Sequence, residues 1–411
     1  MKKPLLYLVP VYIGSLKYFA KLYPALSKKF DVLFLLVRGN DRRRGQMVEY
    51  CKTQGYPFVI LEEGLNRDGK SIPFFSPLMR RLRHIRACRA FMQAHKPVKV
   101  VLTKTIAPHD AIAREAARAG AELTVLQWSF HSHDPVFVAD LNLSKPLYKR
   151  LYFGPVRALL ALLDVIYVGP RYFRHYLLPA KFGAFDEKAA EGYAVSYRFK
   201  RENIFVVGMA DFQTVHELRD RISADPAFKQ RLLSKYSIDS KKKNILIIAQ
   251  SFHLRSWTRM TFPNQLAYYR DLIERIRAVV PKEEADILLK LHPGDSPGQY
   301  ESYRPDGVSV FADESATEEL AVLADLIISD TWTTANYLVV ASGTPALFVN
   351  FTPFQVRNAA IDYYHVKEAV TDKTRFDELL RTWKEEKLPS QYDGSFVRPA
   401  AIDEAVKLIE R

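Results

Sequence analysis

The fold is decided by DILLKLHPGD at residues 286–295 and by LADLIISDTWTT at residues 323–334. Each is an apolar run of strand length that ends in polar residues, and the first stops at a Pro-Gly break. A helical pattern follows at 335–341, then a Gly-Thr-Pro stop at 343–345 and a further apolar run at 346–351. Strands that alternate with helices in this way predict a parallel sheet with crossover helices.

Several polar side chains follow these predicted strands, at the edge where such sheets bind ligands. His292 ends the first strand, and Thr331, Thr333 and Thr334 come after the second, where they open a helix. Free N–H groups and the helix dipole favour an anion there, so we predict a phosphate site. The alternatives are a buried histidine bonded to a carbonyl, and threonines that only cap the helix.

Further residues at the same edge are predicted to contribute to the same phosphate-bearing ligand site. Some follow the apolar run 244–249, where a solvated loop is the alternative, and two follow the run 308–311, a region that in GT-B enzymes often meets the base or ribose. These additional residues are Gln250, Ser251, His253, Arg255, Lys290, Pro293, Glu314, Ser315, Ser329 and Asp330.

Length and composition indicate a globular protein of two domains. The chain has 411 residues, 48% of them hydrophobic and 12% aromatic, which is enough to bury a full core. Two cysteines, with no zinc-like spacing, fit a reducing compartment. The start resembles a signal peptide, but its two prolines and the missing cleavage site favour a first strand. The most apolar stretch, 156–168, is too short to span a bilayer. We therefore expect a cytoplasmic protein, either soluble or peripheral on the cytoplasmic face of the inner membrane.

The strand and helix patterns divide the chain into two similar halves. Residues 1–210 and 241–390 each read as a doubly wound, Rossmann-like domain. Residues 211–240 are polar and read as a linker, and 391–411 read as a tail that ends in a helix. The predicted fold is therefore α/β of the GT-B type, with two Rossmann-like domains facing a cleft. The first domain would lie on the acceptor side and the second would bind the nucleotide donor.

A reaction that removes a proton at this edge needs a general base, which we expect on the first domain. Two loops after predicted strands qualify. One holds His109 and Asp110, and the other holds His131, His133 and Asp134. Metal binding and an ordinary polar loop are the rival interpretations of the second loop. Because no distant third ligand can be named, we predict no metal.

The second half resembles the bacterial CDP-glycerol glycerophosphotransferases and the bacterial sialyl- and Kdo-type transferases. These proteins share a strand ending in Lys-x-His-Pro, here 290–293, and a later Ser-Asp with hydroxyl residues opening a helix, here 329–334. A Gly-x-Pro follows, here 343–345, and a Tyr-Asp-Gly precedes the last helix, here 392–394. The departure is Trp332, in a segment where the families usually carry serine. The resemblance implies a metal-independent enzyme with no separate cofactor. It would use a cytidine- or uridine-linked donor, with CMP or CDP favoured over UDP.

Two other functions stay open beside transfer to a cell-surface glycan or lipid-linked acceptor. Residues 208–211 and 249–255 are similar to the non-hydrolysing UDP-N-acetylglucosamine 2-epimerases, which place a His-Arg pair at this point, here His253 and Arg255. The carboxylates that those enzymes use have no clear match in this chain. The non-enzyme alternative is a basic protein that keeps the fold and binds membranes or nucleic acid. No nucleic-acid-binding motif supports that last partner.

The net charge of +14 is concentrated in the predicted first domain, most densely at residues 80–89. Arg81, Arg83 and Arg86 lie there, with the apolar Leu82, Ile85 and Met92 at helical spacing beside them. Lipid-linked acceptors are common for surface-glycan transferases, so we predict that this helix docks on an anionic membrane. The alternatives are a solvated helix face, arginines paired with acidic neighbours, and arginines that hold a phosphate on a soluble acceptor.

Overall fold

The computed structural model describes residues 3–37, 41–61, 76–103, 109–127, 180–197, 199–254, 260–313, 316–331, 333, 335–352 and 365–411. Only the backbone is described at 41–43, 76–81 and 195–197. The chain divides into two compact units. The first unit contains the described residues up to Ala210 together with the C-terminal segment Ala400–Arg411, and the second contains those of Asp211–Pro399.

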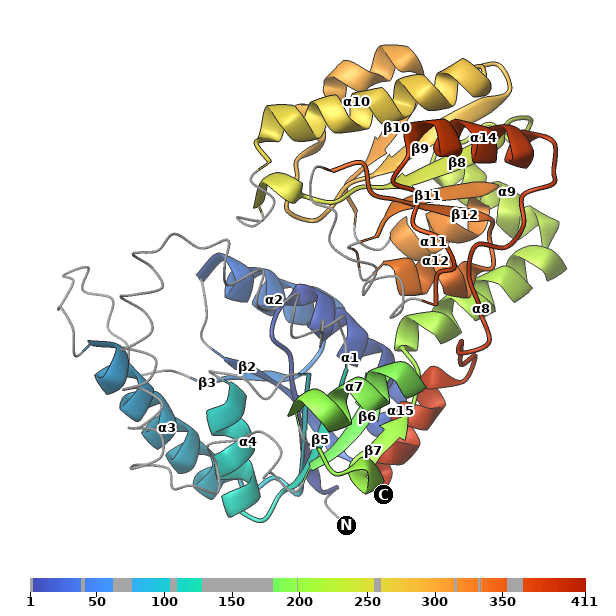
Figure 1. Cartoon of the computed structure of the whole chain (residues 1–411). Helices are drawn as coiled ribbons and strands as arrows, with labels where there is room; N and C mark the ends of the chain where they lie inside the picture. The colour runs from blue at the N-terminus through green and yellow to red at the C-terminus, as the bar shows by residue number, and fades with distance from the viewer. Residues whose placement is uncertain are drawn as a thin grey trace. The chain divides into compact units, whose positions relative to one another are not determined.

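The described strands of the first unit form a seven-stranded parallel sheet in the order β3-β2-β1-β4-β5-β6-β7 (Figure 1). The strands are β1 (Leu5–Val9), β2 (Asp31–Val37), β3 (Phe58–Leu61), β4 (Lys99–Leu102), β5 (Glu122–Leu126), β6 (Ala180–Ala184) and β7 (Ile204–Val206). The described helices of this unit are α1 (Ile13–Leu26), α2 (Asp41–Gln54), α3 (Ser76–His95), α4 (His109–Arg118), α7 (Glu187–Tyr197) and α15 (Ala401–Glu410), with the 3-10 turn η3 (Arg201–Asn203).

Both faces of this sheet are covered, as its continuous apolar strands require. Tyr7 and Val9 of β1 pack in one core cluster with residues of α3, α4 and α7. Leu6 and Leu8, which alternate with them, pack in another cluster with residues of α1, α2 and α15. The sheet is therefore doubly wound, as predicted.

The second unit repeats this plan with a five-stranded parallel sheet in the order β10-β9-β8-β11-β12. Its strands are β8 (Lys243–Ile248), β9 (Ala285–Lys290), β10 (Val308–Phe311), β11 (Leu326–Asp330) and β12 (Ala346–Val349). Its described helices are α8 (Ala210–Ala224), α9 (Pro226–Lys235), α10 (Phe262–Val279), α11 (Ala316–Leu323), α12 (Asn336–Ser342) and α14 (Lys373–Lys384), with the 3-10 segments η4 (Phe252–Leu254) and η5 (Pro297–Asp306). Side chains of α10 and α14 pack with Ile245 and Ile247 on one face of the sheet.

The segments expected between and after the two domains are ordered parts of the units. Residues 211–240, expected as a linker, form nearly all of α8 and the whole of α9 in the second unit. The expected tail at 391–411 is divided, because α15 belongs to the first unit and its Leu408 and Ile409 are in the core there. None of the described helices is long and apolar enough to cross a bilayer.

Candidate functional site

Three loops come together at the carboxyl edge of the second sheet. The loop after β8 carries Ser251 and His253, the loop after β9 carries His292 and Asp295, and β11 ends at Asp330. The sheet order puts β8 between β9 and β11, so the strands that follow it along the chain are added first on one side of β8 and then on the other. This is the topological switch point at which open α/β sheets bind ligands.

Asp330 anchors one side of this edge. It is buried, and its two carboxylate oxygens accept hydrogen bonds from Tyr268 Oη at 2.7 Å and Tyr269 Oη at 2.9 Å. Burial raises the pKa of Asp330 to about 7, and the two hydrogen bonds oppose that rise. Tyr269 Oη also accepts the backbone N–H of Gln250 at 2.6 Å. Helix α10 is thereby tied to the end of β11 and to the turn after β8.

The turn after β11 is held by its own polar groups. Ser329 Oγ donates to Asn336 Oδ1 at 2.6 Å, and Asn336 Nδ2 donates to the backbone oxygen of Asp330 at 3.0 Å. Thr333 Oγ1 accepts the backbone N–H of Ala335 at 3.2 Å, just before α12 begins. The alternative for the threonines was helix capping, but the residue before α12, Ala335, has no side-chain capping hydrogen bond, and Thr333 instead stabilises the turn ahead of it. Ligand contacts of Ser329, Asp330, Thr333 and the buried Thr331 stay predictions.

A hydrogen bond within its own loop fixes the hydrogen position of His292 at the end of β9. Its Nδ1 accepts the backbone N–H of Gly294 at 3.0 Å. A backbone N–H can only donate, so Nδ1 carries no hydrogen, and the neutral ring must carry its hydrogen on Nε2. Half-buried His292 is therefore a hydrogen-bond donor without being charged. Lys290, two residues earlier on the chain, is buried and donates from Nζ to the backbone oxygen of Leu291 at 2.7 Å.

Ser251 lies against this loop with an unused hydroxyl group. It is 1% exposed, and among the described residues its Oγ has no hydrogen-bond partner. Gly294 allows the two loops to approach closely. A Cβ atom at Gly294 would lie 2.4 Å from Leu254 Cδ1 and 3.5 Å from Ser251 Oγ.

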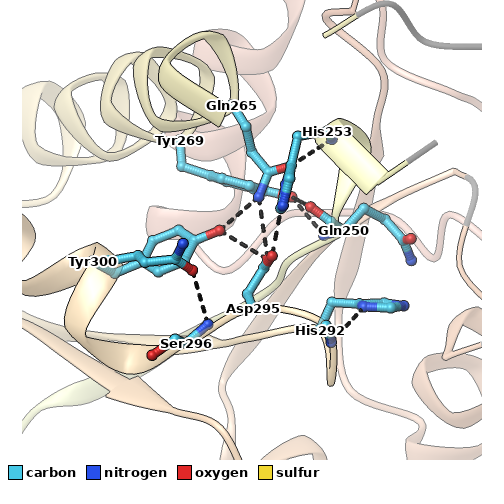
Figure 2. Close-up of polar contacts among 10 residues, drawn as sticks. Gln250, His253, Gln265, Tyr269, His292, Asp295, Ser296 and Tyr300 are labelled. Carbon is cyan, nitrogen blue, oxygen red and sulfur yellow. Dashed lines mark hydrogen bonds and ion pairs between the residues drawn. The ribbon is translucent and has the colours of Figure 1, made fainter. Parts of the chain in front are cut away.

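A second buried network fixes His253 (Figure 2). Gln265 Oε1 accepts the backbone N–H of His253 at 3.2 Å and lies 3.1 Å from its Nδ1. Gln265 Nε2 donates to Asp295 Oδ2 at 3.1 Å and to Tyr300 Oη at 2.6 Å, and Tyr300 Oη donates to Asp295 Oδ2 at 2.9 Å. Burial, then the charge of Asp295, raise the pKa of Tyr300, so its hydroxyl group stays a donor. The imidazole edge also packs on Phe262, with ring centroids 5.1 Å apart.

The sequence did not single out five residues that build these networks. Gln265, Tyr268 and Tyr269 come from α10, Tyr300 comes from η5, and Asp295 follows the Pro-Gly break. The sequence did contain a signal for two of them. Gln265 and Tyr269 are one helical turn apart, which places these polar side chains together on the buried face of α10.

The predicted catalytic residues of the first unit are only partly described. His109 is buried at the first position of α4. The carboxylate of Asp110 accepts from Arg114 Nη2 at 2.9 Å and from the backbone N–H of Ala111 at 2.8 Å. Both pairings are local to α4, so a role of Asp110 as a base stays a prediction. The other predicted residues that lie outside the described ones are His131, His133, Asp134, Arg255, Glu314, Ser315 and Thr334.

Helix α3 corrects one part of the membrane prediction. Arg83 and Arg86 are exposed on it, while the side chain of Arg81 is outside the described residues. Ile85 and Met92 are 7% and 0% exposed and belong to the core of the first unit. The apolar side of the helix therefore packs on its own sheet, and the expected apolar contact of these two residues with lipid is wrong. Attraction by charge stays a prediction.

Comparison with known proteins bears out the fold. No protein-family model and no curated protein matches the chain. A UDP-GlcNAc 2-epimerase from Neisseria meningitidis, bound to UDP-GlcNAc, is 11% identical, with 100% of both chains covered and a TM-score of 0.59. The wall teichoic acid polymerase TagF, soaked with CDPG, is 10% identical, with 100% of this chain and 88% of that one covered and a TM-score of 0.55. MurG from Acinetobacter baumannii is 12% identical, with 99% of both chains covered and a TM-score of 0.52. The chain has the GT-B fold, as predicted.

Proposed function

We propose that the chain is an enzyme that binds the phosphate of a nucleotide-linked substrate at the carboxyl ends of β8, β9 and β11. The observation that carries this proposal is the convergence of polar groups there. Ser251 Oγ is buried and has no partner among the described residues, and neutral His292 carries its hydrogen on Nε2. Both are groups that can donate to phosphate oxygens, and they lie at the switch point of a sheet.

The reaction that this site supports best is metal-independent group transfer. A hexosyl, sialyl, Kdo-type or glycerophospho group would pass from a cytidine or uridine nucleotide to a hydroxyl of a cell-surface glycan or lipid-linked acceptor. The bond to the donor phosphate breaks, and negative charge grows on the phosphate that departs. His292 and Ser251 offset that charge as hydrogen-bond donors. A base on the first unit would take the acceptor's proton, and His109 is a described candidate.

Cytidine is the base that we favour, because residues 290–293 carry the Lys-x-His-Pro ending that resembles the CDP-glycerol and CMP-dependent transferases. TagF, a structural match soaked with CDPG, is consistent with this choice. The experiment is a thermal-shift panel with CMP, CDP, UMP and UDP, with AMP and ADP as controls. A ligand at one hundred times its Kd stabilises a protein by about 2.7 kcal/mol, which a melting curve resolves. No stabilisation by any of the four pyrimidine nucleotides would refute the proposal.

An epimerase is the second candidate, favoured by His253 after β8 and by the matches to UDP-GlcNAc 2-epimerases. Such an enzyme would change the configuration at C2 of a UDP-N-acetylhexosamine with no acceptor present. Incubation with UDP-GlcNAc in heavy water separates the two reactions. Deuterium at C2 without an acceptor supports epimerisation, and its absence together with acceptor-dependent release of nucleotide supports transfer.

A further inference from the structure

His253 and His292 follow the neighbouring strands β8 and β9. When neutral, the two rings carry their hydrogen on different nitrogens. His292 has an N–H donor at its Nδ1, so its neutral ring carries its hydrogen on Nε2. His253 has acceptors at its Nδ1. Gln265 must turn its oxygen toward His253, because the backbone N–H of His253 donates to that same oxygen. The Nδ1 that lies 3.1 Å from this oxygen must therefore carry the hydrogen.

A neutral His253 consequently presents a lone pair at Nε2. The described residues give that nitrogen no hydrogen-bond partner, and the side chain is 18% exposed while Asp295 behind it is 0% exposed. A phosphate oxygen is also an acceptor, so it cannot form a hydrogen bond with the lone pair at Nε2 of neutral His253. Only the imidazolium form of His253 can donate to phosphate, whereas His292 donates without protonation.

The buried carboxylate of Asp295 is an acceptor that fits the imidazolium form of His253. Asp295 Oδ2 already accepts from Gln265 and Tyr300, but Oδ1 has no hydrogen-bond partner among the described residues. Oδ1 lies 3.7 Å from His253 Nδ1, just beyond hydrogen-bond distance. A small rotation of the ring would bring Nδ1–H to Oδ1. The carboxylate would then face the positive charge of the imidazolium.

We propose that His253 takes up a proton when a phosphate-bearing ligand binds, and that Asp295 and Gln265 are the positioning residues for that proton-linked state. The step is simple in its balance: one proton passes from solvent to His253 Nε2, and the new N–H donates to a phosphate oxygen. No covalent bond of the ligand changes. His292 serves beside it as a donor that needs no proton.

The groups that face His253 are consistent with this assignment. The charged side chain paired with it among the described residues is Asp295, from the loop after β9. Helix α10 contributes the uncharged Gln265 and the ring of Phe262, and Tyr300 from η5 stays a neutral donor. Arg255, two residues further along the chain, lies outside the described residues.

The inference rests on the proposed nucleotide site, and calorimetry separates the two. We would titrate the full chain with CDP and with UDP at about pH 8, where the terminal phosphate is ionised because its second pKa is about 6. Runs in Tris and in HEPES, which differ in ionisation enthalpy, give the number of protons taken up. We expect the wild type to take up a large fraction of one proton per nucleotide. Its affinity should fall as the pH rises, by at most about tenfold per pH unit for one linked proton.

Substitutions identify the side chain that takes up the proton. His253→Gln should bind with no proton uptake, and Asp295→Asn should take up much less than the wild type. His292→Gln is the matched control: it should bind more weakly with the proton number of the wild type. If Asp295→Asn does not fold, His253→Gln alone decides, because its side chain is partly exposed.

The outcomes are distinct. Binding of CDP or UDP without proton uptake overturns this inference and leaves the proposed function standing. Uptake that persists in His253→Gln also overturns it, because another group then carries the proton. If neither CMP, CDP, UMP nor UDP binds at all, the proposed function and this inference both fall.

Discussion

Replacing Asp330 by asparagine should change how the stability of the second unit depends on pH. Burial holds the pKa of the Asp330 carboxyl at about 7, against an ordinary value of 3.8. The folded state therefore binds a proton more tightly than the unfolded state. Stability from this group is complete below pH 3.8 and is lost as the pH rises to about 7. The difference between these two pKa values, at 1.36 kcal/mol per pH unit, corresponds to a loss of about 4 kcal/mol in the free energy of unfolding.

Asparagine is a close mimic of the protonated carboxyl in this setting. When Asp330 is neutral, Tyr269 can accept a hydrogen bond from it and turn its own O–H to the backbone oxygen of Gln250, which lies 3.2 Å away. The amide group of the introduced asparagine can donate the same bond. Asp330→Asn should therefore match the wild type near pH 4. It should become more stable than the wild type by up to about 4 kcal/mol near pH 8.

The assay is urea unfolding at pH 4 to 8, followed by tryptophan fluorescence, to which the buried Trp383 of this unit contributes. Ser329→Ala is the matched control in the same turn. It removes the hydrogen bond to Asn336 and should cost about 1 kcal/mol at every pH, because no titrating group is lost. A stability difference between Asp330→Asn and wild type that stays constant from pH 4 to 8 would refute the reasoning.

Three further predictions concern the site and the basic helix. His292→Ala should lower turnover on the order of a hundredfold or more while circular dichroism stays unchanged, and a fully active variant would show that His292 is not a phosphate donor. Gly294→Ala should weaken nucleotide binding modestly in the same titration, because its Cβ would lie 3.2 Å from His292 Nδ1 and press on that ring, whereas Leu254 ends in an exposed side chain that can turn away. Arg83→Glu with Arg86→Glu should reduce sedimentation with anionic liposomes, and wild-type binding should be lost at high salt. Equal recovery in the supernatant with neutral and anionic vesicles would rule docking out.

The sequence was sufficient for the fold because buried parallel strands are short apolar runs bounded by turn residues. The runs at 286–291 and 326–330 could be placed in one parallel sheet, and the edge that holds His292 followed from strand direction. Helix α3 shows where the pattern was ambiguous. Ile85 and Met92 form an apolar stripe that fits a membrane and a protein core equally well, and only the packed structure shows that they are in the core.

The chemistry of the site could not be read from the sequence because it depends on hydrogen positions set by distant residues. His253 and His292 are the same residue type, each following a strand of one sheet. What distinguishes them is that one ring meets a backbone N–H two residues away, while the other meets the oxygen of Gln265, twelve residues away on a helix. A glutamine on the buried face of α10 thus determines which ring nitrogen of neutral His253 carries the hydrogen. In this fold the residues that select the reactive form of a side chain lie in the core of the second unit, behind the edge that the sequence identifies.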